Sequence, residues 1–178
     1  MIDETKTSAR PDLVAVRVRV ARWPKDLPAA QHLFTRYFES LRTDPSVPPE
    51  IRTKDRAPEL NGLATRYRDS TACLLLAFAG EQIVGCAAVT QLKSPNDAVE
   101  MKRLYVLPEA RGRGAGRALI QACATWARER GARELLLDTL PDAMPEAVRL
   151  YRSLGFEPTA RYNENEGRGF AFFRLALE

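Results

Sequence analysis

The sequence predicts a single mixed α/β domain, with a mostly antiparallel central sheet that helices flank. Three observations predict this fold class. The middle of the chain holds three short apolar segments separated by turn residues, which is typical of an antiparallel meander. A glycine-spaced loop then opens into an amphipathic segment. The aliphatic run after it, Glu134–Thr139, is typical of a buried strand with a parallel neighbour.

Length and composition agree with one globular domain. The chain has 178 residues, 45% of them hydrophobic and 28% charged, which suffices for one full core. No apolar run approaches the roughly 20 residues of a membrane span, and the first ten residues lack the apolar segment of a signal peptide. We therefore expect a cytoplasmic protein with no membrane partner. The net charge of +4 favours anionic ligands but does not indicate a nucleic-acid partner.

Residue types that bind metals are sparse. The single histidine, His32, lies beside an apolar helical stripe and has no partner at metal-ligand spacing. The three cysteines, Cys73, Cys86 and Cys123, are isolated within apolar runs. We expect buried thiols, a structural or surface histidine, and no metal site.

The first part of the chain predicts a tail, a strand and a helix. Residues 1–12 are polar and predict a flexible tail, so the domain is assigned to residues 13–178. Valine alternates with arginine from Val14 to Ala21, which predicts a half-buried strand. Asp26 is a candidate N-cap for a helix that begins at Leu27 and carries apolar residues at helical spacing.

A proline-rich segment follows this helix. Four prolines and several charges from Thr43 to Pro58 predict a long loop, and a short helix is expected from Glu59 to Tyr67. A long loop in a compact domain is often a lid or a binding loop, with a disordered insertion as the alternative. We assign the loop to the side where an acceptor substrate would bind.

The predicted meander consists of Cys73–Ala79, Gln82–Leu92 and Ala98–Val106. Gly80 and Glu81 form its first turn, and Gly85 within the second strand indicates a bulge or a close backbone approach. The remaining elements are two helices, one parallel strand and a closing antiparallel pair: Gly114–Arg130, Glu134–Thr139, Pro145–Leu154, Phe156–Tyr162 and Phe170–Leu177.

The most informative stretch runs from Glu100 to Gly116, which predicts a strand, a short turn and a glycine loop that opens into a helix. Glycines 112, 114 and 116 allow positive φ angles and a close approach of the backbone to a ligand. The helix that follows presents unpaired N–H groups and its positive dipole end. The stretch therefore predicts an anion site.

Two kinds of phosphate loop are considered first. A P-loop requires a lysine and a hydroxyl residue after its last glycine, and this loop has neither. A dinucleotide-binding fold requires G-x-G-x-x-G after a fully buried first strand, whereas this loop reads G-x-G-x-G and follows a half-polar strand. Three antiparallel strands also precede the loop, which makes the dinucleotide fold the weaker interpretation.

The residues of two motifs resemble the GNAT superfamily of acetyl-CoA-dependent N-acetyltransferases. The first is [QR]-x-x-G-x-[GA], present as Arg111-Gly112-Arg113-Gly114-Ala115-Gly116 after a strand ending L-Y-V-x-P. The second is A-x-x-L-Y-x-x-x-G-F, present from Ala147 to Phe156. The motifs cover about a third of the chain, and the order of predicted elements agrees over the rest. The resemblance implies a GNAT-type sheet that is splayed between two parallel strands.

The resemblance also implies how acetyl-CoA binds. Backbone N–H groups from Gly112 to Gly116, including those of Arg113, Gly114 and Ala115, would cradle the pyrophosphate, with Arg111 adding favourable charge. Main-chain groups of Leu104, Tyr105 and Val106 would bind the pantetheine arm in the gap beside strand Glu134–Thr139. Many family members carry an asparagine where this chain has Met144, so that contact is not carried over.

Acetyl transfer to an amine requires a base, because amines are mostly protonated at pH 7. Glu100 matches the strand position of a glutamate base in some family members. In a regular strand it shares a face with Lys102, Leu104 and Val106, unless a bulge intervenes. Glu100 is a base if this face lines the acceptor cleft, and a bystander paired with Lys102 if the face is solvated.

Two further residues are candidates for proton transfer. Tyr151 matches the family tyrosine that protonates the coenzyme A thiolate, with core packing as its alternative role. Asp138 is a secondary base candidate that could instead cap the following loop.

The resemblance and the candidate residues together predict an N-acetyltransferase that transfers the acetyl group of acetyl-CoA to a primary amine by direct attack. A cysteine intermediate is not expected, since no cysteine lies near a histidine base. The alternative is a non-catalytic acyl-CoA-binding or regulatory module on the same fold. The acceptor, a small-molecule amine or a peptide amine, is left open, and a homodimer would be consistent with the family.

Overall fold

The computed structural model describes residues 15–93, 97–164 and 169–178. The predicted tail, residues 1–12, lies outside these ranges, so the proposed domain boundary stays a prediction. The described elements, in chain order, are β1 (Val16–Val20), α1 (Leu27–Thr43), α2 (Pro49–Arg52), α3 (Ala57–Asn61), α4 (Leu63–Arg66), β2 (Ala72–Ala79), β3 (Gln82–Gln91), β4 (Ala98–Val106), the 3₁₀ turn η1 (Pro108–Ala110), α5 (Ala115–Arg128), β5 (Glu134–Thr139), α6 (Pro145–Ser153), β6 (Glu157–Pro158) and β7 (Ala171–Ala176).

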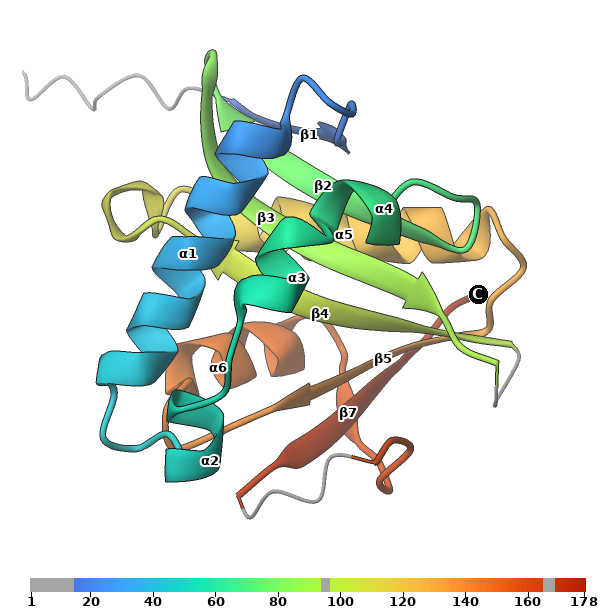
Figure 1. Cartoon of the computed structure of the whole chain (residues 1–178). Helices are drawn as coiled ribbons and strands as arrows, with labels where there is room; N and C mark the ends of the chain where they lie inside the picture. The colour runs from blue at the N-terminus through green and yellow to red at the C-terminus, as the bar shows by residue number, and fades with distance from the viewer. Residues whose placement is uncertain (1–14, 94–96, 165–168) are drawn as a thin grey trace, which may run out of the picture.

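One open sheet with the strand order β1-β2-β3-β4-β5-β7-β6 organises the fold. All neighbouring strands are antiparallel except β4 and β5. Helices α1 to α4 cover one face of the sheet, and α5 and α6 cover the other (Figure 1). This arrangement confirms the predicted mixed, mostly antiparallel sheet flanked by helices.

The core lies on both faces of the central strands. Seven of the eight residues of β2 are buried, as its unbroken apolar run predicts. Cys73 of β2, Cys86 of β3 and Cys123 of α5 are all buried, as expected. Burial raises the pKa of the Cys73 and Cys86 thiols to about 12, so neither is an activated nucleophile. No described helix is long and apolar enough to cross a membrane.

The parallel strands β4 and β5 separate after a short paired stretch. They pair only from Ala98 to Glu100, opposite Glu134 to Leu136, although both strands continue further. Glu100 is therefore the last residue of β4 that pairs with β5, at the point where the two strands diverge. Beyond it, the edge of β4 that faces β5 has no strand partner among the described residues.

A bulge in β4 changes which residues share a face. Ala88 pairs with Lys102, whereas Cys86 pairs with Tyr105, so β4 contains one extra residue. Arg103 lies in this bulge with a φ of 56°. Because Cys86 and Ala88 share a face, Lys102 shares its face with Tyr105. A regular strand would instead have placed Leu104 and Val106 on that face.

A close contact between β3 and β4 explains a glycine in the sequence. A Cβ atom at Gly85 would lie 2.7 Å from the Tyr105 carbonyl oxygen. A register shift between β2 and β3 occurs opposite this position. The prediction of a bulge or a close backbone approach at Gly85 is confirmed.

Three local predictions need correction. Asp26 occupies the N-cap position of α1, but its carboxylate does not cap the helix; it accepts hydrogen bonds from the Arg22 N–H and from Arg19, 2.6 Å each. The helix expected from Glu59 to Tyr67 is two short helices that meet at Gly62, and the preceding proline-rich loop contains α2. The first closing strand pairs over only Glu157 and Pro158.

Candidate active site

Two cavities lie on either side of one group of side chains. The first, about 550 Å³, is lined by the glycine loop and the end of β4, and we call it the loop cavity. The second, about 980 Å³, is lined by Glu100 and Asp138, and we call it the carboxylate cavity. Tyr37, Leu41 and Met144 line both cavities and form their junction.

The glycine loop has the backbone conformation that an anion site requires. Gly112 and Gly114 have φ angles of 75° and 85°, which favour glycine, and no protein atom lies within 4 Å of a Cβ built on either. Gly114 is the N-cap of α5, whose first intrahelical bond runs from the Ala118 N–H to the Gly114 carbonyl. The amides between them therefore have no partner within the helix.

Gly116 serves helix packing. A Cβ atom there would lie 3.1 Å from Leu150 Cδ2 of α6. The third glycine thus lets α5 approach the helix that carries the second motif.

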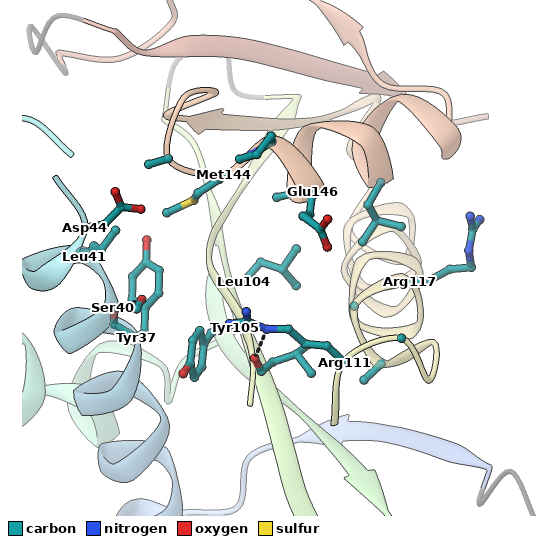
Figure 2. Close-up of a pocket in the computed structure, with 18 of the residues that line it drawn as sticks. Tyr37, Ser40, Leu41, Asp44, Leu104, Tyr105, Arg111, Arg117, Met144 and Glu146 are labelled. Carbon is teal, nitrogen blue, oxygen red and sulfur yellow. Dashed lines mark hydrogen bonds between the residues drawn. The ribbon is translucent and has the colours of Figure 1, made fainter. Parts of the chain in front are cut away.

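Charged side chains around the loop point in different directions. Arg111 donates from Nε to the Val106 carbonyl oxygen at 3.0 Å, whereas Arg117 extends away from the cavity toward Ser153 (Figure 2). Arg113 is exposed and does not line the loop cavity. Asp44 and Glu146 also line the cavity, and Asp44 lies beside the junction residues Tyr37 and Leu41 (Figure 2).

The main-chain candidates on β4 lie in the same cavity. Leu104, Tyr105 and Val106 all line it, next to the unpaired edge of the strand. The bulge places Leu104 and Val106 on the face opposite Tyr105, so both faces of this end of β4 contribute to the cavity. The predicted cofactor residues other than Arg113 are thus brought together in one cavity.

Glu100 is a buried carboxylate in the second cavity, with 7% of its surface exposed. Its Oε1 accepts hydrogen bonds from the Tyr162 hydroxyl at 3.0 Å and from Asn163 Nδ2 at 3.1 Å. Its Oε2 lies 3.1 Å from Lys102 Nζ. Glu100 thus lines a cavity and also pairs with Lys102, which is one feature of each alternative, and its role as a base stays a prediction.

Asp138 lies close to Glu100 through a shared partner. Asn163 Nδ2 also donates to Asp138 Oδ2, at 2.9 Å, and so bridges the two carboxylates. Tyr162 and Asn163 belong to the segment between β6 and β7, more than 60 positions from Glu100. Neither residue was predicted as part of the site, because no motif or spacing links a polar loop to a distant strand.

Tyr151 occupies a more enclosed position. Its ring packs against Phe156 and Phe173, and it lines neither cavity. Burial raises the pKa of its hydroxyl, and the nearby Tyr37, Cys123 and Asp138 raise it further. The ring of Tyr151 thus packs in the core, and its hydroxyl lies close enough to Asp138 to interact with that charge.

Tyr37, from α1, is a junction residue that was not predicted as part of the site. Its ring lies 5.8 Å from that of Tyr105, and its hydroxyl points between Met144 and Asp44 (Figure 2). Burial raises the pKa of this hydroxyl, so it remains a neutral hydrogen-bond donor. Met144 accepts a weak hydrogen bond from the Thr139 hydroxyl at 3.7 Å.

The family model described as the acetyltransferase (GNAT) family matches residues 27–156, which include both cavities' junction and both motifs. The chain belongs to the GNAT acetyltransferase family. Its members use acetyl-CoA as the acetyl donor, so the predicted family, enzyme class and donor are confirmed.

Similar proteins agree with this assignment. An uncharacterized N-acetyltransferase of Schizosaccharomyces pombe is 29% identical over 163 residues, which cover 91% of this chain and 95% of that protein. The aminoglycoside N(6′)-acetyltransferase type 1 of Stenotrophomonas maltophilia is 30% identical over 131 residues, 70% of this chain and 80% of that one. The fold is similar to that of YncA, a putative acetyltransferase of Salmonella typhimurium solved with its cofactor acetyl-CoA. The two structures match with a TM-score of 0.69 at 23% sequence identity, over 92% of this chain and 95% of YncA.

Proposed function

We propose that this chain transfers the acetyl group of acetyl-CoA to a primary amine by direct attack, with the donor in the loop cavity and the amine in the carboxylate cavity. The observation that carries the proposal is the junction: the cavity lined by the glycine loop meets the cavity lined by Glu100 and Asp138 at Tyr37, Leu41 and Met144. A thioester at this junction would be within reach of both.

The loop cavity would bind the donor mainly through backbone groups. The pyrophosphate would accept hydrogen bonds from the amides between Gly112 and Gly116, where the dipole of α5 also favours negative charge. The pantetheine arm would pair with the unpaired edge of β4 at Leu104–Val106. Arg111 now bonds the Val106 carbonyl, so it would exchange that partner for a ligand group.

In the carboxylate cavity, Glu100 would act as the base. It removes a proton from the amine, directly or through water, and the amine nitrogen then attacks the thioester carbonyl carbon. The carbon–sulfur bond breaks, and the products are an amide and coenzyme A. Asp138, held to Glu100 through Asn163, adds negative charge that would attract the protonated amine into the cavity.

Tyr151 is proposed as the proton donor to the departing thiolate. Its raised pKa keeps the hydroxyl protonated at neutral pH, as a donor must be. Its enclosed position means that the thioester sulfur would have to approach it from the junction. Its packing against Phe156 and Phe173 would fix its orientation.

The acceptor class is not fixed by the family, whose members here include an aminoglycoside acetyltransferase. The test is a panel of polyamines, amino acids, aminoglycosides and peptides, incubated with acetyl-CoA while free thiol and acetylated product are measured. We expect stoichiometric thiol and N-acetyl product with at least one amine. Tight acetyl-CoA binding without turnover on the whole panel would favour the non-catalytic acyl-CoA-binding module instead.

A further inference from the structure

The carboxylate cavity has a second, oppositely charged end. Arg103 makes a bidentate ion pair with Glu59, at 2.7 Å from Nε and 2.9 Å from Nη2. Arg66 lies 4.0 Å from the same carboxylate, and Arg56 lines the cavity beside them. Lys54 and Asp55 also line this end, so four cationic side chains face two carboxylates and positive charge is in excess.

Arg56 is the arginine that carries this excess. Within the described parts of the chain it makes no ion pair, and its only hydrogen bond is a long one, 3.3 Å from Nη2 to the Ile51 carbonyl. A guanidinium has five N–H donors, so most of those of Arg56 are left for water or a ligand. Asp55, on the same loop, instead accepts a hydrogen bond from the Ala57 N–H at 3.0 Å.

The position of Arg56 is fixed by packing. Its guanidinium carbon lies 4.9 Å from the centre of the Phe38 ring, and that of Arg103 lies 5.7 Å from the same ring. Burial, and then the neighbouring Arg103, lower the pKa of Arg56. A desolvated cation beside another cation gains more from an anionic ligand than an exposed one does.

The two charged ends line one cavity at a limited separation. Glu100 and Arg103 both belong to β4, and three strand residues span at most about 10 Å. Because Arg56 and Glu100 line this same cavity, a ligand that spans it can contact both ends. A guanidinium matches the planar geometry of a carboxylate.

We propose that the acceptor amine also carries a carboxylate, which Arg56 holds at the cationic end while the amine faces Glu100 and Asp138. The part of this inference that concerns the amine rests on the proposed function, whereas the carboxylate site at Arg56 does not depend on it. The preferred acceptors are amino acids with a spacer, or short peptides, rather than polycations such as aminoglycosides.

The test compares two matched pairs of amines, 4-aminobutyrate with 4-aminobutanamide and glycylglycine with glycylglycinamide. Thiol release is expressed per neutral amine, because the loss of a carboxylate also changes the amine pKa. We expect each acid to exceed its amide by about tenfold or more in kcat/KM, the effect of one charge-assisted hydrogen-bonded contact. Equal rates for acid and amide in the wild-type enzyme would overturn the inference.

The Arg56→Met variant identifies the residue responsible. It should abolish the preference for the acids while changing the rates of the amides by less than about twofold. Arg56→Lys should retain part of the preference, and Arg68→Met, at an exposed arginine outside both cavities, should retain all of it. A preference that survives Arg56→Met would contradict the assignment.

A binding measurement separates this inference from the proposed function. The same four compounds are titrated calorimetrically into Glu100→Gln loaded with acetyl-CoA. Tighter binding of the acids without any turnover by the wild-type enzyme would refute acetyl transfer to these amines but support the carboxylate site. Turnover without any preference in rate or binding would support acetyl transfer and refute the carboxylate site.

Discussion

The loop cavity and the carboxylate cavity bind by different means. The loop cavity offers mainly backbone groups: the amides before Ala118 and the unpaired edge of β4. The carboxylate cavity offers charged side chains, and its partners are far apart in sequence, such as Arg103 with Glu59 or Asn163 with Glu100. A backbone site suits one donor shared by a family, whereas a side-chain site can change its specificity by substitution.

Strand β4 contributes residues to both cavities, on either side of its bulge. Before it, Glu100 and Lys102 face the carboxylate cavity; after it, Leu104 and Val106 face the loop cavity. Arg103 within the bulge adopts a φ of 56° and is held by Glu59 from α3. The strain of this conformation, about 1–3 kcal/mol, is offset by that ion pair.

The largest expected effect comes from Glu100→Gln, which separates chemistry from donor binding. We expect kcat to fall about a hundred- to a thousandfold, because a general base contributes about that much. The Kd for acetyl-CoA should stay within about twofold, since Glu100 does not line the loop cavity. Stopped-flow or steady-state thiol release and calorimetry measure the two constants. Glu81→Gln, at an exposed turn, is the control and should change neither.

An equal loss of donor affinity in Glu100→Gln would contradict the division into two sites. An unchanged kcat would remove Glu100 as the base and leave Asp138 as the candidate.

Gly114→Val tests the opposite half of the comparison. Valine is strained at the φ of 85° that Gly114 adopts, so the loop should lose its shape. We expect the Kd for acetyl-CoA to rise about ten- to a hundredfold, as measured by calorimetry. Gly131→Val is a matched control, because Gly131 has a φ of 73° and open space at the other end of α5. If both variants weaken acetyl-CoA binding equally, the effect is a general loss of stability and the loop has no special role.

The smallest expected effect is on stability, through the ion pair between Glu59 and Arg103 in the carboxylate cavity. Glu59→Gln leaves the Arg103 guanidinium without its carboxylate and should lower the free energy of unfolding at pH 7 by roughly 2 kcal/mol. Although burial opposes it, the hydrogen bond from Arg103 lowers the pKa of Glu59 below its ordinary value of 4.5. The stability that the pair contributes is therefore complete above pH 4.5 and is lost as the pH falls through the lowered pKa.

Chemical denaturation at several pH values checks this prediction. The difference between wild type and Glu59→Gln should be largest at neutral pH and shrink below pH 4.5. Glu129→Gln, which removes an exposed ion pair with Arg130, should cost less than about 0.5 kcal/mol at every pH. A difference that does not depend on pH would mean that the charge of Glu59 is unimportant.

The bounds of the secondary-structure elements could be predicted from the sequence better than the contacts between side chains. The bounds of β4 and β5, the glycine loop and the start of α6 follow from local signals: apolar runs, glycine spacing and a proline at a helix start. These signals act within a few residues and therefore survive in a single sequence. The same holds for the close approach at Gly85.

The missed features all depend on contacts between distant segments. Neither the bulge at Arg103 nor its ion pair with Glu59 has a local signature, since both need α3 to pack on β4. Tyr162 and Asn163 reach Glu100 only because β7 pairs with β5 and brings their loop back to the splayed strands. The carboxylate of Asp26 likewise does not cap α1 as expected, because it accepts a hydrogen bond from Arg19, seven residues earlier.

A crystal structure of the complex with acetyl-CoA would show whether the donor extends from the loop cavity to the junction. We expect the pyrophosphate against the amides of Gly112–Gly116 and the thioester at the junction of Tyr37, Leu41 and Met144, facing Glu100. A pyrophosphate bound away from the glycine loop, or a thioester turned away from the carboxylate cavity, would contradict this expectation.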